Sequence, residues 1–146
     1  MICSKVLVPS GVLGLGFDIE ALKNGLNRKP DIISIDGGST DSGPYSLGSG
    51  TSKYSRSAIK SEWKILMKAR EEAKIPLLIG SSGTCGTDEM VDWMEDITIE
   101  LAEEMGQSIK ITKLYCEQDK EFIKTSFKNK KISSLDPSPK IDTDIR

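Results

Sequence analysis

Short apolar runs alternate along the chain with longer segments in which apolar residues recur every three or four positions. The short runs are typical of buried strands, and the longer segments are typical of helices that pack one face on a sheet. The runs cover residues 5–9, 31–35, 76–80 and 109–115. Helices are predicted after them at residues 18–28, 55–74, 87–105 and 119–128, the third starting at Thr87 or Asp88.

Two of these helices carry well-defined apolar stripes. The first stripe consists of Ile59, Trp63, Leu66, Met67 and Ala73. The second consists of Met90, Val91, Met94, Ile97, Leu101 and Ala102. Asp18 is a suitable N-cap for the first predicted helix, and Gly106 stands where a helix C-terminal glycine belongs. We expect both stripes to face the sheet.

Strands that alternate with helices predict parallel pairing and right-handed crossovers. The expected fold class is α/β, with a three-layer, mainly parallel sheet of about four or more strands and helical crossovers, Rossmann- or flavodoxin-like. A fragment of a barrel is the alternative. This domain is expected over residues 1–132. Residues 133–146 are polar, contain Pro137 and Pro139, and predict a linker or C-terminal tail that a longer protein could continue.

Composition narrows the possible partners. The chain has 146 residues, 37% of them hydrophobic and 29% charged, which is typical of one globular domain. A formal net charge of -2 gives no basic excess, so nucleic acid is not an expected partner. No apolar run reaches the length that spans a bilayer, so a membrane is not expected either. The start of the chain lacks signal-peptide features, which favours a cytoplasmic location.

Histidine and cysteine content limits the chemistry. Because the chain has no histidine, it cannot form a Ser-His-Asp or Cys-His nucleophile by itself. Proton transfer would fall to carboxylates, lysine, tyrosine, cysteine or a partner's residues. Cys3, Cys85 and Cys116 are an odd number at wide spacings, which argues against a disulfide framework or a structural zinc site. Cys85 is either a reactive thiol or, as we expect, a small buried residue.

Glycine- and hydroxyl-rich loops follow the first three predicted strands, at residues 10–16, at 36 to about 53, and at 81–88, and they predict a ligand site. In open parallel sheets, ligands bind outside the carboxyl ends of the strands. The third loop, residues 81–88, runs directly into a helix and is the best candidate for holding a phosphate, a carboxylate or a thioester carbonyl. The alternative is that these glycines only make tight turns. The candidate ligand-binding residues are Ser10, Gly11, Gly37, Gly38, Ser39, Thr40, Ser81, Ser82, Gly83 and Thr84.

Four residues near the predicted strand ends are candidates for proton transfer: Asp36, Asp41, Lys53 and Glu117. The two aspartates have an alternative role, in which they hydrogen-bond turn amides. Together with Glu117 and Asp119 they could form a carboxylate site for magnesium, but the spacing does not demand one and no metal is predicted. For Asp119 we favour helix capping. The sequence identifies no cofactor.

Two short motifs resemble nucleotide-binding loops without fulfilling their patterns, and a third kind of loop is absent. The glycine spacing of residues 11–16 is the reverse of the dinucleotide fingerprint, and the chain contains no P-loop lysine motif. Residues 35–40 are similar to the phosphate loop of sugar kinases, which lies in a hairpin, whereas this one links a strand to a helix. We therefore treat that match as coincidental.

The loops taken together resemble a known family. Residues 36–50 and 55–60, residues 75–88 with Val91-Asp-Trp93, and residues 117–120 are similar to the N-terminal region of the acyclic terpene utilisation (AtuA-like) family. The resemblance covers most of residues 6–136, and the second loop is its most specific part. It implies an N-terminal portion of a longer protein, or a short relative, in the catabolism of acyclic terpenoids through CoA thioesters. The resemblance assigns no catalytic residue to this chain.

Three functional hypotheses remain open at this point. The first is an enzyme or enzyme domain that acts on a small carboxylate or CoA-linked substrate, with the anion in the third loop. The second is a non-catalytic binding or assembly domain that completes a site with a second domain or in a homo-oligomer. The third, an ATPase of the sugar-kinase type, is the least favoured because short motifs match often by chance.

Overall fold

A computed structural model of the protein describes residues 3–38 and 45–133. Its internal contacts divide the chain into two compact units, Met1–Cys116 and Glu117–Arg146. The predicted domain boundary after residue 132 rested on composition, whereas this division rests on contacts. Ser39, Thr40 and Asp41, which the sequence nominates for the site, lie outside the described residues.

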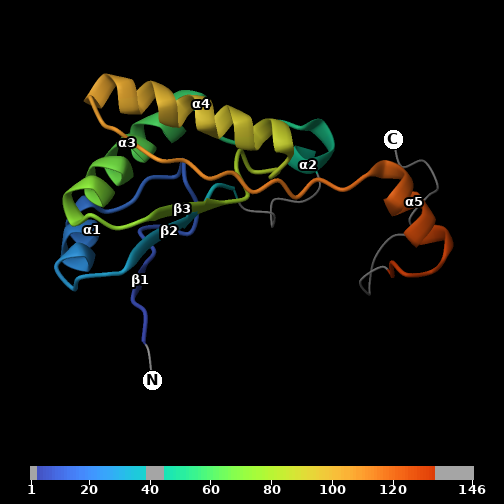
Figure 1. Ribbon diagram of the computed structural model, residues 1–146, viewed down its shortest axis with the longest axis horizontal. Helices are drawn as coiled ribbons and strands as arrows, with labels where there is room; N and C mark the ends of the chain where they lie inside the picture. Colours follow the sequence, from blue (N-terminus) through green and yellow to red (C-terminus); the bar gives the residue numbers. More distant parts are fainter. Residues whose placement is uncertain (1–2, 39–44, 134–146) are drawn as a thin grey trace. The chain divides into compact units, whose positions relative to one another are not determined.

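The first unit contains a parallel sheet of three strands in the order β1-β2-β3 (Figure 1). The strands are β1 (Val6–Leu7), β2 (Ile32–Asp36) and β3 (Leu77–Gly80). Leu7 is paired with Ile33, and Ile33 is paired with Leu77, so that these three residues form one row across the sheet. The α/β character and the parallel pairing expected from the sequence are therefore confirmed.

Five helices accompany the strands in the described residues. They are α1 (Ile19–Leu26), α2 (Tyr45–Ser49), α3 (Arg56–Ala73), α4 (Asp88–Met105) and, in the second unit, α5 (Lys120–Lys128). All but α2 were predicted to within a few residues. The short helix α2 lies in a stretch that was expected to be loop throughout.

Local capping chemistry explains why four of these helices begin where they do. The side chains of Asp18, Ser55, Thr87 and Asp119 accept backbone N–H groups in the first turns of α1, α3, α4 and α5. The capping role that we favoured for Asp119 is therefore confirmed. At the other end of α4, Gly106 adopts φ 62° and ψ 31°, a left-handed conformation that costs glycine little.

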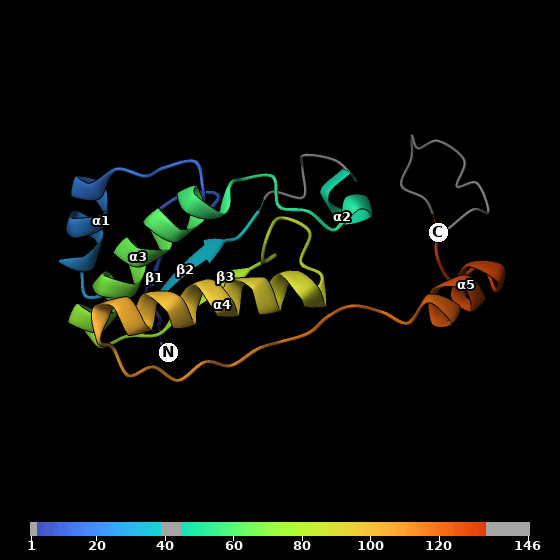
Figure 2. The ribbon, with the colours of Figure 1, turned by 90° about the horizontal axis from the view of Figure 1, so that it is seen from above.

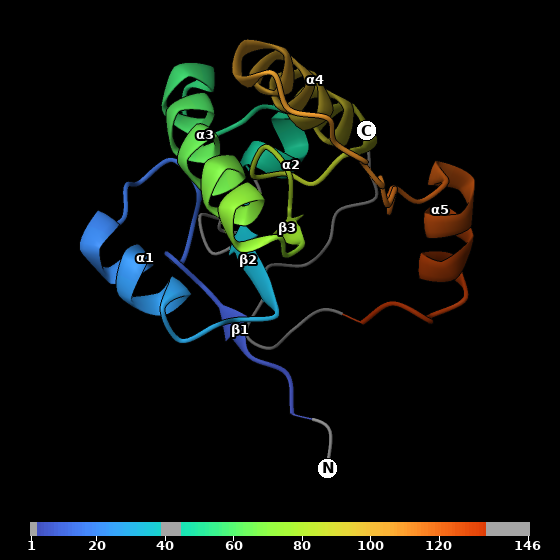
Figure 3. The ribbon, with the colours of Figure 1, turned by 60° about the vertical axis from the view of Figure 1, so that its left-hand side comes forward.

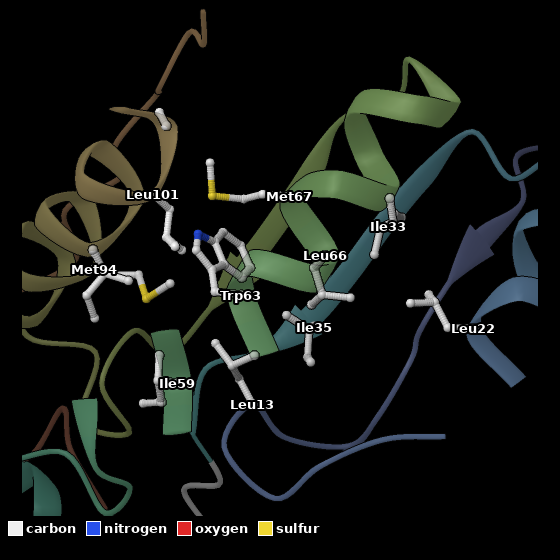
Figure 4. Packing of buried hydrophobic residues seen from close by; sticks show 13 residues of the cluster. Leu13, Leu22, Ile33, Ile35, Ile59, Trp63, Leu66, Met67, Met94 and Leu101 are labelled. Carbon is white, nitrogen blue, oxygen red and sulfur yellow. The ribbon is translucent and has the colours of Figure 1, made fainter. Parts of the chain in front are cut away.

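The hydrophobic core lies between the sheet and the helices α3 and α4 (Figure 4). Ile33 and Ile35 of β2 enter it from the sheet, and both predicted stripes contribute to it. The exceptions are Ala73, which is exposed, Val91, which is half-buried, and Met90, which is buried outside this cluster. Trp63 also links the two helices, because its Nε1 donates a hydrogen bond of 2.9 Å to Oγ1 of Thr98.

In the first unit, α1, α3 and α4 follow one side of the strands (Figure 3). α1 packs so closely on that side that a Cβ at Gly25 would come within 2.4 Å of Leu7 Cδ1. The alternate strand residues Val6 and Leu78 are 56% and 55% exposed. The described residues of this unit thus form one helical layer on one sheet, and the second helical layer of the expected three stays a prediction.

Residues 109–115 form no strand in the structure, in contrast to the sequence-based expectation. The segment leaves the end of α4 and runs in extended form along that helix (Figures 1 and 2). Lys113 binds Asp92 and Glu95 of α4 at 2.9 and 2.6 Å, and Tyr115 donates a hydrogen bond to Asp92. These side-chain contacts, which local sequence signals do not encode, keep the segment on α4.

Candidate functional site

The three glycine-rich loops meet at the carboxyl edge of the sheet. Leu13 in the first loop donates its backbone N–H to the carbonyl of Asp36 at 2.8 Å. Gly37 in the second donates to the carbonyl of Gly80 at 2.6 Å, and Thr84 in the third donates to Gly37 at 3.3 Å. The arrangement follows from parallel strands whose carboxyl ends share one edge.

Glycine is required where the second loop meets the third. A Cβ at Gly38 would lie 2.0 Å from the Cα of Thr84, and one at Gly37 would lie 2.6 Å from the carbonyl oxygen of Gly80. Both positions therefore serve the packing of one loop against another. Packing between the loops is thus one reason for glycine at these two positions. Ligand binding, which the sequence suggested, is a second reason.

The third loop satisfies several of its own amide groups. Within it, the N–H groups of Thr84, Cys85 and Gly86 donate to the carbonyls of Ser81, Gly83 and Ser82. Ser82 and Thr84 are buried, with exposed fractions of 7% and 3%, while Ser81 is exposed. A Cβ at Gly83 would come within 2.5 Å of Met90 Sδ, which fixes the loop on the first turn of α4. Because these backbone N–H groups already have acceptors within the loop, a ligand would contact mainly side chains at the rim of the loop.

Lys53 and Asp36 belong to the same edge of the sheet. The backbone N–H of Lys53 donates to Oγ1 of Thr84 at 3.1 Å, which attaches the end of the second loop to the third. The ammonium group of Lys53 lies 5.7 Å from the ring centroid of Tyr54. Asp36 Oδ1 accepts the N–H of Gly38 at 3.0 Å, which is the turn-stabilising role named as its alternative.

The first loop is closed by Glu62, a residue that sequence reasoning missed. Its two carboxylate oxygens accept the N–H groups of Gly14 and Gly16, each at 2.7 Å. Ser10, predicted to bind ligand, has Oγ within 3.3 Å of the carbonyl of Val12. In the sequence Glu62 resembles any polar residue on the outer face of a helix, so no local signal could have identified it.

Among the remaining candidates for proton transfer, Asp41 lies outside the described residues. Glu117 belongs to the second unit, which begins at that residue. No group of three or more acidic or cysteine side chains that could hold a metal ion comes together in residues 3–38 and 45–133. None of the helices in those ranges is long and apolar enough to cross a membrane.

A groove of about 790 Å³ leads away from the third loop. Its walls come from α3, α4, β3 and residues 109–114, and it includes Ser81, Ser82, Cys85 and Gly86 at the loop. The apolar lining includes Trp63, Met67, Met94, Leu77, Ile79 and Ile111. The groove exists because residues 109–114 are not paired with β3. The sequence predicted a strand in this segment, so the groove was not expected.

Charged side chains stand at the rim of this groove. Glu95 and Lys113 both line it and form the 2.6 Å ion pair that holds residues 109–114 on α4. The hydrogen bond to Glu95, followed by those to Tyr115 and Asp92, raises the pKa of Lys113 above its usual range. The hydrogen bonds from Tyr115 and Lys113 lower the pKa of Asp92. These charges therefore persist throughout the neutral range of pH.

Comparisons of the chain with family models, with curated proteins and with solved structures give no match. The site is therefore interpreted from its own geometry, and the resemblance to the AtuA-like family stays a prediction.

Proposed function

We propose that the chain binds a small anionic or CoA-linked molecule at the edge where its glycine-rich loops meet. The observation that carries this proposal is the hydrogen bond from Lys53 N–H to Thr84 Oγ1, at 3.1 Å. It places the backbone of Lys53 beside the third loop, which carries the hydroxyl groups of Ser81 and Ser82, and the Lys53 ammonium lies 5.7 Å from the ring centroid of the neighbouring Tyr54. A cation with neighbouring hydroxyl donors is a common way to hold a carboxylate or a phosphate.

The N-terminus of α4 contributes less to this proposal than the sequence suggested. Asp88 and Glu89 occupy its first turn, and their charges already complement the helix dipole. The N–H of Met90 is capped by Thr87 Oγ1 at 3.3 Å. We therefore assign the main attraction for an anion to Lys53 and to the serine hydroxyls of the third loop.

The resemblance to the AtuA-like family supports a CoA thioester as the larger form of the ligand. The thioester carbonyl would accept hydrogen bonds at the third loop, and Asp36 with Lys53 would transfer protons, because both lie at that edge. The carboxylate of Asp36 accepts one backbone N–H and has further acceptor positions for a substrate proton. Asp41, which lies outside the described residues, and Glu117, which lies in the second unit, stay candidates from the sequence alone.

For the fold, the finer proposal is a Rossmann- or flavodoxin-like sheet with a fourth parallel strand beside β3. Residues 109–115, which run extended along α4 in the structure, would provide this strand on pairing with β3. The order β1-β2-β3 and the passage through α4 after β3 support it, because a further right-handed crossover would bring the chain back beside β3. The proposed location of the protein is the cytoplasm.

A binding or assembly domain without catalysis is the second candidate function. It is favoured by the side of the sheet that lacks helices in the described first unit. Val6, Val8 and Leu78 are exposed. Val6 and Leu78 alternate with strand residues that pack on the core, so they lie on that side of the strands. Apolar side chains gathered in this way are typical of surfaces that contact another domain or subunit. This function predicts self-association or a partner domain, and no turnover.

The test is a titration of the full chain with acetate, inorganic phosphate and acetyl-CoA by isothermal calorimetry. The anion-binding proposal predicts saturable binding of at least one of them. Lys53→Met should weaken it by about tenfold to a hundredfold, since hydrogen bonds to charged groups contribute about 1.5–3 kcal/mol. Lys68→Met is the matched control, because Lys68 is an exposed lysine on α3. Equal binding by Lys53→Met and the unchanged protein would contradict the proposal.

A further inference from the structure

At the outer edge of the sheet, backbone groups of β3 have no partner among the described residues, and these groups face the groove. Pro76 and Gly80 accept backbone hydrogen bonds from Ile33 and Gly37 of the neighbouring chain segment, at 3.0 and 2.6 Å. In a parallel ladder, successive residues direct their backbone groups alternately to one neighbour and to the other. The N–H and C=O groups of Leu77 and Ile79 therefore face away from β2, and both residues line the groove.

The opposite wall of the groove is the extended segment of residues 109–114, here called the strap. In the described structure, its backbone groups have no hydrogen bond. The strap begins after Gly106 and follows α4, which itself follows β3. A strand, a helix and an extended segment in this order are the parts of a right-handed crossover unit.

The side chains of the strap alternate as in a strand that covers a core. Ile109 packs against the hydrophobic cluster, and Ile111, two residues later, is also half-buried. Lys110 and Thr112 between them are exposed. Residues two apart in an extended chain share one face, so the strap carries an apolar face that matches Leu77 and Ile79.

The strap is held away from pairing by its contacts to α4. Lys113 binds Asp92 and Glu95, and Tyr115 donates to Asp92. The side chains of Lys113 and Glu95 are half-buried and that of Asp92 is exposed, so water still reaches these ion pairs and screens them. Ion pairs open to water contribute little to stability and can be exchanged for other contacts at small cost. Pairing with β3 would satisfy backbone groups of both segments and bury the apolar lining of the groove.

We propose that the strap is a gate with two positions. In the open position it is tethered to α4 through Lys113, and the groove leads to Ser82 and Cys85. In the closed position it pairs with Leu77 and Ile79 as a fourth strand and fills the groove. The movement would regulate ligand access, and this regulatory role rests on the anion site proposed above. The movement itself does not depend on that site.

The test uses the full chain and compares Lys113→Met with Lys110→Met. Lys113→Met removes the tether and keeps a long side chain, and Lys110→Met makes the same change on the exposed side of the strap. In a parallel ladder, Ile79 bonds to the residues on either side of its aligned partner, so the N–H groups of Ile79 and Thr112 would enter the new bonds. Amide hydrogen exchange of Ile79 and Thr112 should slow by tenfold or more in Lys113→Met and stay unchanged in Lys110→Met. Exchange in Lys113→Met that is as fast as in the unchanged protein, or faster, would overturn the proposal.

Alkylation of Cys85 by iodoacetamide, resolved by peptide mass spectrometry, gives a second measurement of the same movement. Cys85 lines the groove and is half-buried, so closure should slow its modification several-fold in Lys113→Met. Modification of Cys3, which is exposed and not among the groove residues, should not change. An unchanged rate at Cys85 would contradict closure.

Titration with inorganic phosphate separates the gate from the anion site. Weaker phosphate binding in Lys113→Met, together with slower exchange, supports gated access. Slower exchange with no phosphate binding in any variant would overturn the anion site and the regulatory role, while the movement would stand. Unchanged exchange with normal phosphate binding would overturn the gate and leave the anion site intact.

Discussion

The carboxylate of Glu62 on α3 accepts the backbone N–H of Gly14 at 2.7 Å, and its second oxygen accepts the N–H of Gly16 at the same distance. The glycine-rich turn after β1 is thus closed around a carboxylate that the chain itself supplies. Gly14 and Gly16 have φ values of 105° and 86°, conformations that only glycine adopts easily. These two donors of the first loop consequently serve the fold, and the search for a ligand moves to the second and third loops.

Replacement of Glu62 should destabilise the protein without removing a core side chain. Glu62→Ala leaves two backbone N–H groups without their acceptor, and we expect a loss of about 2 kcal/mol in the free energy of unfolding, with Glu62→Gln intermediate. Urea denaturation followed by tryptophan fluorescence measures it. Glu72→Ala is the control, because Glu72 is an exposed glutamate on the same helix. A Glu62→Ala variant as stable as the control would show that the turn does not depend on this carboxylate.

The contact between the second and third loops predicts a large effect of a single methyl group. Gly38→Ala would place a Cβ 2.0 Å from the Cα of Thr84, so the loops must separate, at a cost of about 1–3 kcal/mol. Gly48→Ala meets nothing within 4 Å and should change stability little. Thermal unfolding of the two variants measures the difference. Equal midpoints would mean that the loops are not packed together in solution.

Acid should weaken the packing of α3 on α4. Hydrogen bonds from Lys60 and Lys64 lower the pKa of Glu104 from 4.5 to about 2. Because the pKa is lower in the folded protein, the contribution of Glu104 is complete above about pH 4.5 and disappears as the pH falls toward 2. Urea midpoints measured between pH 7 and pH 2 should fall less steeply for Glu104→Gln. Identical pH profiles for the variant and the unchanged protein would exclude this contribution.

The link between Thr84 and Lys53 predicts a difference between two substitutions of similar size. Thr84→Ser retains the hydroxyl that accepts Lys53 N–H, whereas Thr84→Val removes it from a buried position. We expect Thr84→Val to lose about 1–3 kcal/mol of stability and, if the site is as proposed, most of its affinity for phosphate. Calorimetric titration of both variants shows whether the hydroxyl matters. Equal affinity of Thr84→Val and Thr84→Ser for phosphate would show that ligand binding does not depend on the Thr84 hydroxyl.

The sequence predicts those features that depend on neighbouring residues. Asp18 begins α1, and Gly106 ends α4, because capping needs only a few residues of local chain. The apolar spacing likewise predicts that Trp63 and Met94 are buried, which the structure confirms. The meeting of the loops followed from the general property of parallel sheets that their carboxyl ends share one edge.

Features that depend on contacts between distant residues could not be predicted in this way. Residues 109–115 have the composition of a strand, yet the ion pair between Lys113 and Glu95 keeps them on α4. Glu62 is 46 residues from Gly16 in the chain, and nothing near either residue indicates their hydrogen bond. The groove depends on the position of the strap, so it could not be predicted from neighbouring residues in the sequence either.

The most direct test of the proposed anion site is a titration of the isotopically labelled chain with inorganic phosphate and acetyl-CoA, followed by amide chemical shifts. The proposed site predicts saturable shifts at Gly37, Gly38, Lys53 and in the third loop, with little change at Gly14 and Gly16 in the first loop, which is closed by Glu62 and is not assigned to the ligand. Shifts confined to other parts of the chain, or no shifts with either ligand, would contradict an anion site at the edge of the sheet.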